Sequence, residues 1–247
     1  MIKKYNVSGF EVWEYGALTS TNTEAEQWKR EELKDKRVVL TYRQMSGRGQ
    51  ATNRWESEPN KNIAVTVVLC PPCYEASRQF AVSMVCALGV YDFVSKYVEG
   101  VSVKWPNDVY VGDKKICGIL IEHTVAGRFI RSSLCGIGVN INQTVFLSDA
   151  PNPVSLFQLT GKEIPLDKAV EELLACIGKR YGRIEEYEVL ERDFMECLYR
   201  RQGIYRWEDE EGEFEASVVR IDEFGRLVLK DTEGTLRVYG FKEVAYK

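Results

Sequence analysis

The chain has 247 residues, of which 45% are hydrophobic and 28% are charged, with 19 glycines and 7 prolines. This composition is that of a globular protein large enough to bury a core, and it excludes a disordered tail and a fibre. The net charge is −4, and the last 45 residues hold 7 basic and 11 acidic side chains, which leaves 26 of each in the first 202. Neither part has the basic excess of a nucleic-acid-binding protein, so we expect no nucleic-acid partner.

Membrane insertion and a disulfide framework are also disfavoured. The longest apolar stretch, 63–70, has 8 residues, whereas a spanning helix needs about 20, and the first residues lack the apolar core of a signal peptide. Seven scattered cysteines indicate reduced thiols, and so a cytoplasmic protein. Cys70 and Cys73 have redox or zinc spacing, but His123 is the only histidine and a second cysteine pair is missing, so we expect no metal site.

Taken in chain order, the first two thirds of the sequence predict a mixture of strands and helices. β-Branched runs bounded by turn residues indicate strands, and one long apolar segment indicates a buried helix. A hairpin turn is predicted at Gly112–Asp113. The predicted elements are strands at 38–42 and 62–69, a helix at 77–98, and strands at 101–105, 109–111, 116–122 and 129–141.

The remaining third changes from helical to β texture. Between 170 and 198 apolar residues recur at three- and four-residue spacing, which predicts one long helical stretch with Asp167 as its N-cap. After Gly203 short strands are predicted at 214–221, 226–230 and 235–239, and the acidic run 208–213 is typical of a solvated hairpin tip. We therefore predict a larger α+β domain over 1–202 and a small barrel over 203–247.

A segment rich in glycine and arginine follows the first predicted strand. It reads SGRGQATNRW at 46–55. Glycines let the backbone approach a ligand closely, and arginine matches phosphate or carboxylate oxygens. The segment lacks the Gly-Lys-Ser/Thr ending of a phosphate-binding loop and the third glycine of a dinucleotide fingerprint. On its own it therefore fits a flexible surface loop better than a binding site.

Three further polar clusters lie at strand ends. KWPND at 104–108 offers an amide and a carboxylate, or simply a turn. Lys114 fits a charged hairpin tip, but Lys115 adjoins an apolar strand, which that explanation accounts for less well. In GIGVNIN at 136–142 the asparagines need partners if they are buried, as in a satisfied bulge. Together with the glycine–arginine segment these clusters predict an α+β enzyme whose substrate is anionic and contains a nucleotide.

At these residues the sequence resembles the biotin–protein ligases, also called biotin–[acetyl-CoA-carboxylase] ligases. The resemblance covers nearly the whole chain, and KWPND with a downstream lysine is its most specific part. It implies a catalytic domain over 1–202, with a mixed β-sheet flanked by helices as in class II aminoacyl-tRNA synthetases, and an SH3-like barrel over 203–247. The matching motifs are Thr19-Ser20-Thr21-Asn22, Gln44 with Gly47-Arg48-Gly49, KWPND, the run from Lys115 and GIGVNIN.

The resemblance implies a two-step reaction that uses ATP and Mg²⁺. The biotin carboxylate attacks the α-phosphate of ATP to give biotinyl-5′-adenylate and pyrophosphate, and a lysine of a carboxylase's biotin carboxyl carrier domain then displaces AMP. Lys115 would bind the carboxylate and the α-phosphate, Arg48 would close over the intermediate, and Asp108 would orient or deprotonate the incoming lysine. The remaining implied contacts are Ser20, Thr21, Asn22, Gln44, Gly47, Arg48, Gly49, Gln50, Lys115 and Gly118 for biotin, and Arg48, Trp55, Asn107 and Asn140 for the nucleotide.

The chain departs from the family pattern in two ways. The family loop often reads GRGRxGRxW, whereas here Gln50, Thr52 and Asn53 replace two arginines and a glycine, so weaker retention of the adenylate is expected. Relatives that also act as repressors carry an N-terminal helix-turn-helix domain, and the motif at Ser20 begins too early for one. The resemblance therefore implies a monofunctional ligase without operator binding, and it is compatible with a homodimer.

Three alternatives remain open at the level of sequence. A lipoate–protein ligase shares the fold and the adenylate chemistry. The second is a transcription regulator that senses biotin, and the third is a carrier-binding module without catalysis.

Overall fold

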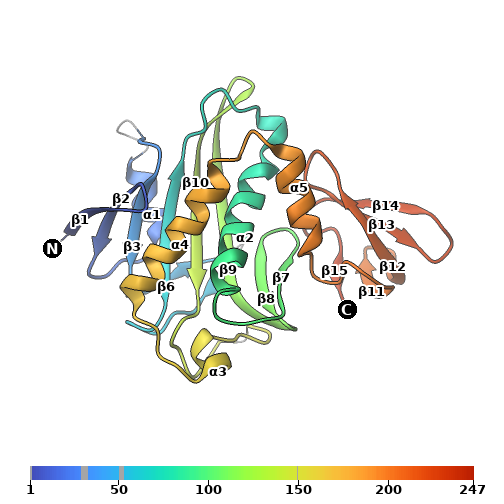
Figure 1. Ribbon diagram of the computed structural model, residues 1–247. Helices are drawn as coiled ribbons and strands as arrows, with labels where there is room; N and C mark the ends of the chain where they lie inside the picture. The colour runs from blue at the N-terminus through green and yellow to red at the C-terminus, as the bar shows by residue number, and fades with distance from the viewer. Residues whose placement is uncertain (1, 29–32, 50–52, 149) are drawn as a thin grey trace.

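The largest feature of the computed structural model, which describes residues 2–28, 33–49, 53–148 and 150–247, is a sheet of eight strands (Figure 1). The strand order is β1-β2-β3-β6-β10-β9-β8-β7. Neighbouring strands pair antiparallel except β2 and β3, which run parallel. The predicted mixed sheet is confirmed. Its strands are β1 (Ile2–Val7), β2 (Phe10–Tyr15), β3 (Arg37–Thr41), β6 (Ile63–Leu69), β7 (Val101–Lys104), β8 (Asp108–Val111), β9 (Lys114–Ala126) and β10 (Phe129–Val139).

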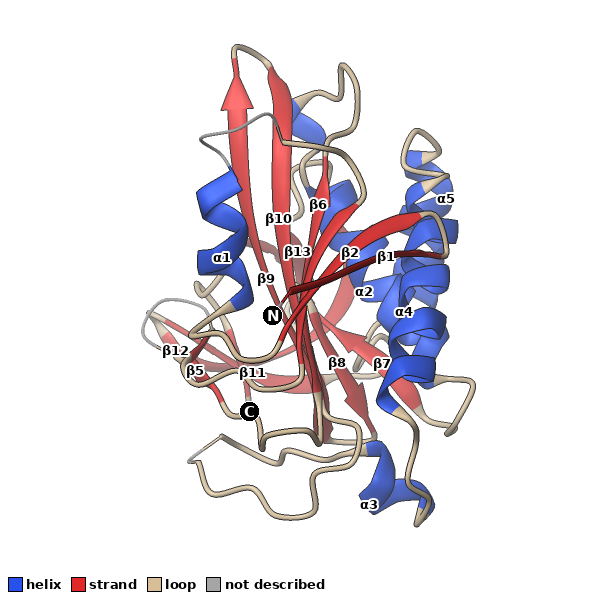
Figure 2. Ribbon diagram, turned by 90° about the vertical axis from the view of Figure 1, so that its left-hand side faces the viewer, coloured by secondary structure: helices blue, strands red, loops and turns tan. Residues whose placement is uncertain are grey.

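Helices cover the sheet unequally on its two faces. One face carries a short 3₁₀ turn (Ala76–Arg78) followed by α2 (Phe80–Val94), with α4 (Leu166–Tyr181) and α5 (Tyr187–Glu196) beside it. The opposite face is covered only in part, by α1 (Thr21–Gln27), which packs against β3, β6 and β10 (Figure 2). The short α3 (Leu156–Thr160) lies at one end of the sheet (Figure 1).

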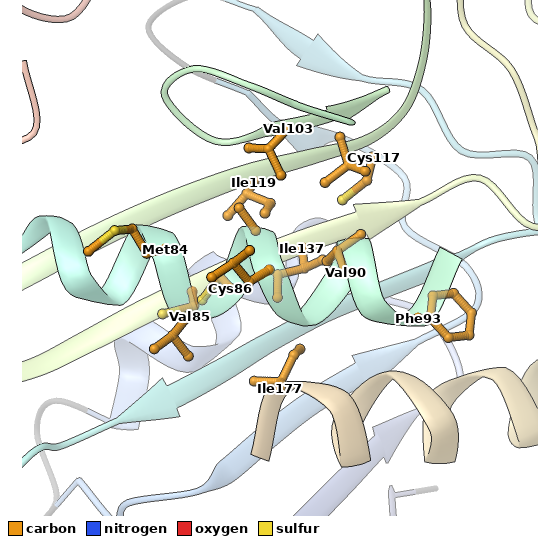
Figure 3. Packing of buried hydrophobic residues seen from close by; sticks show 14 of the residues in the cluster. Met84, Val85, Cys86, Val90, Phe93, Val103, Cys117, Ile119, Ile137 and Ile177 are labelled. Carbon is orange, nitrogen blue, oxygen red and sulfur yellow. The ribbon is translucent and has the colours of Figure 1, made fainter. Parts of the chain in front are cut away.

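The core lies between the sheet and α2. This helix is apolar on nearly every side, which is the pattern of a helix enclosed by protein. Figure 3 shows its side chains packed against residues of β7, β9 and β10 and against Ile177 of α4. Gly89 allows the close approach of α4, because a methyl group there would lie 2.8 Å from the Ile177 side chain. α2 is therefore packed closely between the sheet and α4.

The prediction of a single helix over 170–198 is wrong, because the chain forms two helices, α4 and α5. α4 ends at Tyr181, and hydrogen bonds of the tighter i→i+3 type follow it, from Arg183 N–H to Arg180 O and from Ile184 N–H to Tyr181 O. The apolar spacing continues through this turn, so periodicity alone does not reveal the break. The predicted N-cap is also wrong: Pro165 occupies that position, and Asp167 lies in the first turn of α4.

Residues after 203 form a second, five-stranded sheet with the order β14-β13-β12-β11-β15. Turns at 222–225 and 232–234 separate its strands, and the acidic run 208–213 lies at the β11–β12 hairpin, as predicted. The strand order begins with β14 and ends with β15, so the described residues form a small all-β unit, and its closure into an SH3-like barrel stays a prediction. Its strands are β11 (Tyr205–Asp209), β12 (Gly212–Ile221), β13 (Leu227–Asp231), β14 (Leu236–Tyr239) and β15 (Ala245–Tyr246).

In the part of the chain that is described, no helix combines the length and the apolar character needed to cross a bilayer.

The only histidine gives the fold a testable dependence on pH. His123 in β9 shares a 2.8 Å hydrogen bond with Ser133 of β10, and burial lowers its pKa. The unfolded chain then takes up a proton more readily than the folded protein, so this part of the stability is present above about pH 6.5 and is lost as the pH falls. We expect the urea midpoint to fall between pH 7.5 and 5, and to fall less in His123→Gln. If the urea midpoint changes equally with pH in the unmodified protein and in His123→Gln, this expectation is contradicted.

Candidate functional site

A pocket of about 150 Å³ opens on the face of the sheet that carries α1. It lies between the start of α1, strands β9 and β10, and a two-stranded ribbon made of β4 (Gly47–Arg48) and β5 (Arg54–Trp55). The lining residues are Ser20, Thr21, Asn22, Gln44, Arg48, Gly49, Asn53, Arg54, Trp55, Ala64, Asp108, Lys115, Gly118, Ile119, Leu120, Gly136, Ile137 and Gly138.

Glycines form the floor of the pocket, and one tryptophan covers it. Gly118 of β9 and Gly138 of β10 are direct cross-strand partners. The Trp55 ring lies over both, so that a methyl group on Gly118 would come within 2.9 Å of it and a methyl group on Gly138 would overlap it. The indole N–H of Trp55 is buried and has no hydrogen-bond partner in the described part of the chain. The absence of side chains at Gly118 and Gly138 therefore makes room for the Trp55 ring in the site.

A hydrogen-bond network fixes the residues at the start of α1. The Thr21 backbone N–H donates to Gln44 Oε1 at 2.9 Å. The Asn22 side chain accepts a 2.6 Å bond from the Thr66 hydroxyl and donates a 2.8 Å bond to Glu122 Oε2. Thr66 and Glu122 thus hold the Asn22 side chain from two sides, so this residue is fixed before any ligand arrives.

Arg48 of the ribbon is held by acidic side chains. Its Nη2 atom donates to Glu122 Oε2 at 2.7 Å and lies 3.9 Å from Glu26 Oε1 of α1. The same Glu122 oxygen thus accepts from Asn22 and from Arg48. Because both partners are partly exposed, the ion pair adds little stability, but it joins the ribbon to the pocket wall.

Lys115 and Asp108 form an ion pair of 2.6 Å at the other side of the pocket. The β8–β9 hairpin brings them together, because its register shifts between Val109 and Tyr110. The Lys115 ammonium also lies 6.0 Å from the centre of the Trp55 ring. A cation, a carboxylate and an aromatic ring therefore meet at one place, next to the glycine floor.

The KWPND segment is held between the two sheets. Trp105 donates its indole N–H to the Gly225 carbonyl at 2.9 Å, and its ring contacts Phe241 edge-on at 6.3 Å. Gly225 has φ +81 and lies so close to Phe80 that a methyl group would come within 2.5 Å of that ring. The turn at 222–226 is thus inserted between Phe80 and Trp105, and it sets the position of the residues that follow Trp105.

The lysine of KWPND is surrounded by tyrosines. The Lys104 ammonium lies 4.6 Å from the ring centre of Tyr246 in β15, 4.9 Å from that of Tyr110 and 5.7 Å from that of Tyr199. Burial lowers the pKa of Lys104. In the sheet register Lys104 is the cross-strand partner of Asp108, so its charge lies close to the Asp108–Lys115 pair.

The structure brings most of the predicted site residues together in one pocket. Three predicted residues do not line the pocket: Gly47, Asn107, whose amide donates to the Ile119 carbonyl at 2.7 Å, and Asn140, whose amide donates to the Val154 carbonyl at 3.1 Å. Gln50 lies outside the described residues, as does Thr52. The predicted residues that line the pocket are Ser20, Thr21, Asn22, Gln44, Arg48, Gly49, Trp55, Asp108, Lys115 and Gly118.

The sequence reasoning missed Glu122 and Arg54. Glu122 occupies the same run as Lys115, and strand alternation from Gly118 would have placed it on the pocket face. Arg54 belongs to the glycine–arginine segment but is not among the predicted site residues, although the register places it directly opposite Arg48.

Comparison with known proteins agrees with this geometry. Residues 15–140 match the model of the "Biotin/lipoate A/B protein ligase family". The bifunctional ligase/repressor BirA of Bacillus subtilis is 26% identical over 96% of this chain and 74% of its own length. The biotin--[acetyl-CoA-carboxylase] ligase of Paracoccus denitrificans is 30% identical over 60% of this chain and 64% of its own.

Solved structures show the same fold. The biotin protein ligase of Aquifex aeolicus, determined in complex with biotin and ATP, superposes with a TM-score of 0.79 at 22% identity and covers 96% of this chain and 98% of that one. The family match spans the start of α1, the ribbon, KWPND, Lys115 and the β10 glycines. The chain therefore belongs to the biotin/lipoate A/B protein ligase family.

Proposed function

We propose that the protein is an ATP-dependent biotin–protein ligase, which activates biotin as biotinyl-5′-AMP and transfers it to a lysine of a carboxylase's biotin carboxyl carrier domain. The observation that carries this proposal is the convergence of Lys115, the glycine–arginine ribbon and the start of α1 on one pocket. The family accounts for the adenylate chemistry. The choice of biotin follows from the similarity to biotin ligases in both sequence and fold.

In the first step two anions must meet, the biotin carboxylate and the α-phosphate of ATP. Lys115 is the group suited to bridge them, because its ammonium lies in the pocket beside Trp55. A fixed cation in a partly enclosed site stabilises the charge that develops in the transition state. We assign the biotin contacts to Ser20, Thr21 and Gln44, and contacts with the flat base to Trp55.

In the second step the amine of the carrier lysine attacks the acyl carbon of the adenylate and AMP leaves. Asp108 is the carboxylate that lines the pocket, and it is paired with Lys115 at 2.6 Å. When an anion takes over Lys115, the Asp108 carboxylate becomes available to orient the incoming ammonium and to accept its proton. The ion pair thus keeps both groups in place until substrate arrives.

We propose that Mg²⁺ accompanies ATP. This ion is usually held by substrate phosphates and one or two carboxylates while it keeps several of its waters. The described residues contain no cluster of three metal-ligating side chains, and Asp108 is the carboxylate in the pocket that could add one oxygen. The ion would neutralise phosphate charge.

The free cysteines support a cytoplasmic location for this activity. All seven thiols are unpaired, which matches a reducing compartment.

The proposal is tested by exchange of labelled pyrophosphate into ATP, with biotin or lipoate as the acid. We expect exchange that requires biotin, and ATP-dependent labelling of a carrier domain at one lysine. Exchange that requires lipoate and ignores biotin would overturn the choice of acid. If exchange requires neither biotin nor lipoate, the proposed function is overturned.

A further inference from the structure

Among the described residues three cationic side chains line the pocket, and two of them already have carboxylate partners. Lys115 is paired with Asp108 and Arg48 with Glu122. Arg54 is exposed, and within the described ranges it forms no ion pair. A nucleotide that enters this pocket therefore meets one guanidinium whose charge is not already matched.

The register of the ribbon places the two arginines side by side. β4 and β5 pair antiparallel, with Gly47 opposite Trp55 and Arg48 opposite Arg54. Like charges directly opposite each other across a strand pair are destabilising. Glu122 and Glu26 relieve this repulsion at Arg48 but do not reach Arg54. A bound anion would relieve the remaining repulsion at Arg54. Trp55, which lines the pocket, directly follows Arg54 in the ribbon.

Glu122 holds Arg48 against the pocket wall. Its Oε2 atom accepts from the Arg48 guanidinium at 2.7 Å and from the Asn22 amide at 2.8 Å. Arg48 is thereby tied to the wall on which Thr66 and Asn22 are also fixed. Turning Arg48 toward a phosphate would break this tie, whereas Arg54 can bind a phosphate without breaking any ion pair of the described residues.

From these contacts we infer that Arg54 supplies the guanidinium that binds the phosphates of ATP, whereas Arg48 anchors the ribbon through Glu122. This inference rests on the proposed function. It also gives a role to an arginine in the segment where Gln50 and Asn53 replace arginines of the family loop.

The test is biotin-dependent pyrophosphate exchange, measured as separate KM values for ATP and biotin. For Arg54→Gln we expect the KM for ATP to rise about 10- to 100-fold, as for loss of a charged hydrogen bond, with the KM for biotin unchanged. Arg54→Lys should recover part of the loss. For Arg48→Gln and Glu122→Gln we expect the KM for biotin to rise by no more than about fivefold, as for a partly exposed ion pair, with little change for ATP.

Arg128→Gln is the matched control, because Arg128 is an exposed arginine at the β9–β10 turn, outside the pocket. We expect it to leave both KM values unchanged. An active Arg54→Gln enzyme with a normal KM for ATP would overturn the inference alone, as would an Arg48→Gln enzyme that loses ATP affinity to the same extent. Absence of biotin-dependent exchange in the unmodified protein would instead overturn the proposed function.

Discussion

Replacing Lys115 with alanine is expected to lower the rate of adenylate formation strongly while the fold remains intact. Loss of one fixed group that stabilises developing charge typically lowers a rate by about 10²- to 10³-fold. The backbone of Lys115 is held independently of its side chain, because its N–H donates to the Asn152 carbonyl and its carbonyl accepts from the Val154 N–H. The measurement is biotin-dependent pyrophosphate exchange, together with a thermal unfolding curve.

The neighbouring lysine provides the matched control. Lys114 is exposed at the tip of the same hairpin and does not line the pocket. We expect Lys114→Ala to retain full exchange activity. Equal activities of Lys115→Ala and the unmodified protein would show that the Lys115 ammonium does not act on the carboxylate or the α-phosphate.

Placing a methyl group at Gly136 is expected to damage both the pocket and the stability of the fold. The new Cβ would overlap the Asn22 side-chain oxygen, and Asn22 is held on two sides by Thr66 and Glu122. Overpacking of this kind costs about 1–3 kcal/mol. If the Asn22 side chain moves to avoid the overlap, its hydrogen bonds to Thr66 and Glu122 break and the start of α1 shifts. We expect a lower urea midpoint and a KM for biotin higher by about tenfold, the equivalent of 1.4 kcal/mol.

Thr66→Ala separates the two causes. It removes the 2.6 Å hydrogen bond to Asn22 and adds no group that overlaps it. We expect a loss of about 1–3 kcal/mol, because a buried acceptor loses its donor, and a smaller change in the KM for biotin. If Gly136→Ala raises the KM for biotin no more than Thr66→Ala does, the close approach at Gly136 is not what shapes the pocket.

The central strands and the candidate lysine could be predicted because their causes are local. The hairpin at Gly112–Asp113 and the strands that flank it follow from neighbouring residues, and Gly112 has φ +56 as such a turn requires. Lys115 was singled out because a charged residue adjoined an apolar strand, and this position puts it beside Asp108.

Contacts between distant segments could not be predicted in the same way. No element was predicted before residue 38, yet β2 pairs parallel with β3, and α1 delivers Asn22 to Glu122, which is 100 residues away. The bend after Tyr181 keeps the helical spacing of apolar residues, so the pattern contains no sign of it. These features depend on which surfaces meet, and a one-dimensional pattern does not record that.

The contact between Trp105 and Gly225 has a consequence for how the protein is made. Residues 105 and 225 leave the ribosome far apart in time, because 119 others lie between them. Domains generally begin to fold from the N-terminus during synthesis. Here the large sheet can pair its strands early, but Trp105 gains its hydrogen-bond acceptor only when the turn at 222–226 has emerged. A nascent chain stalled before that turn would contain every residue of the pocket and still lack the support for the strand end that precedes Asp108.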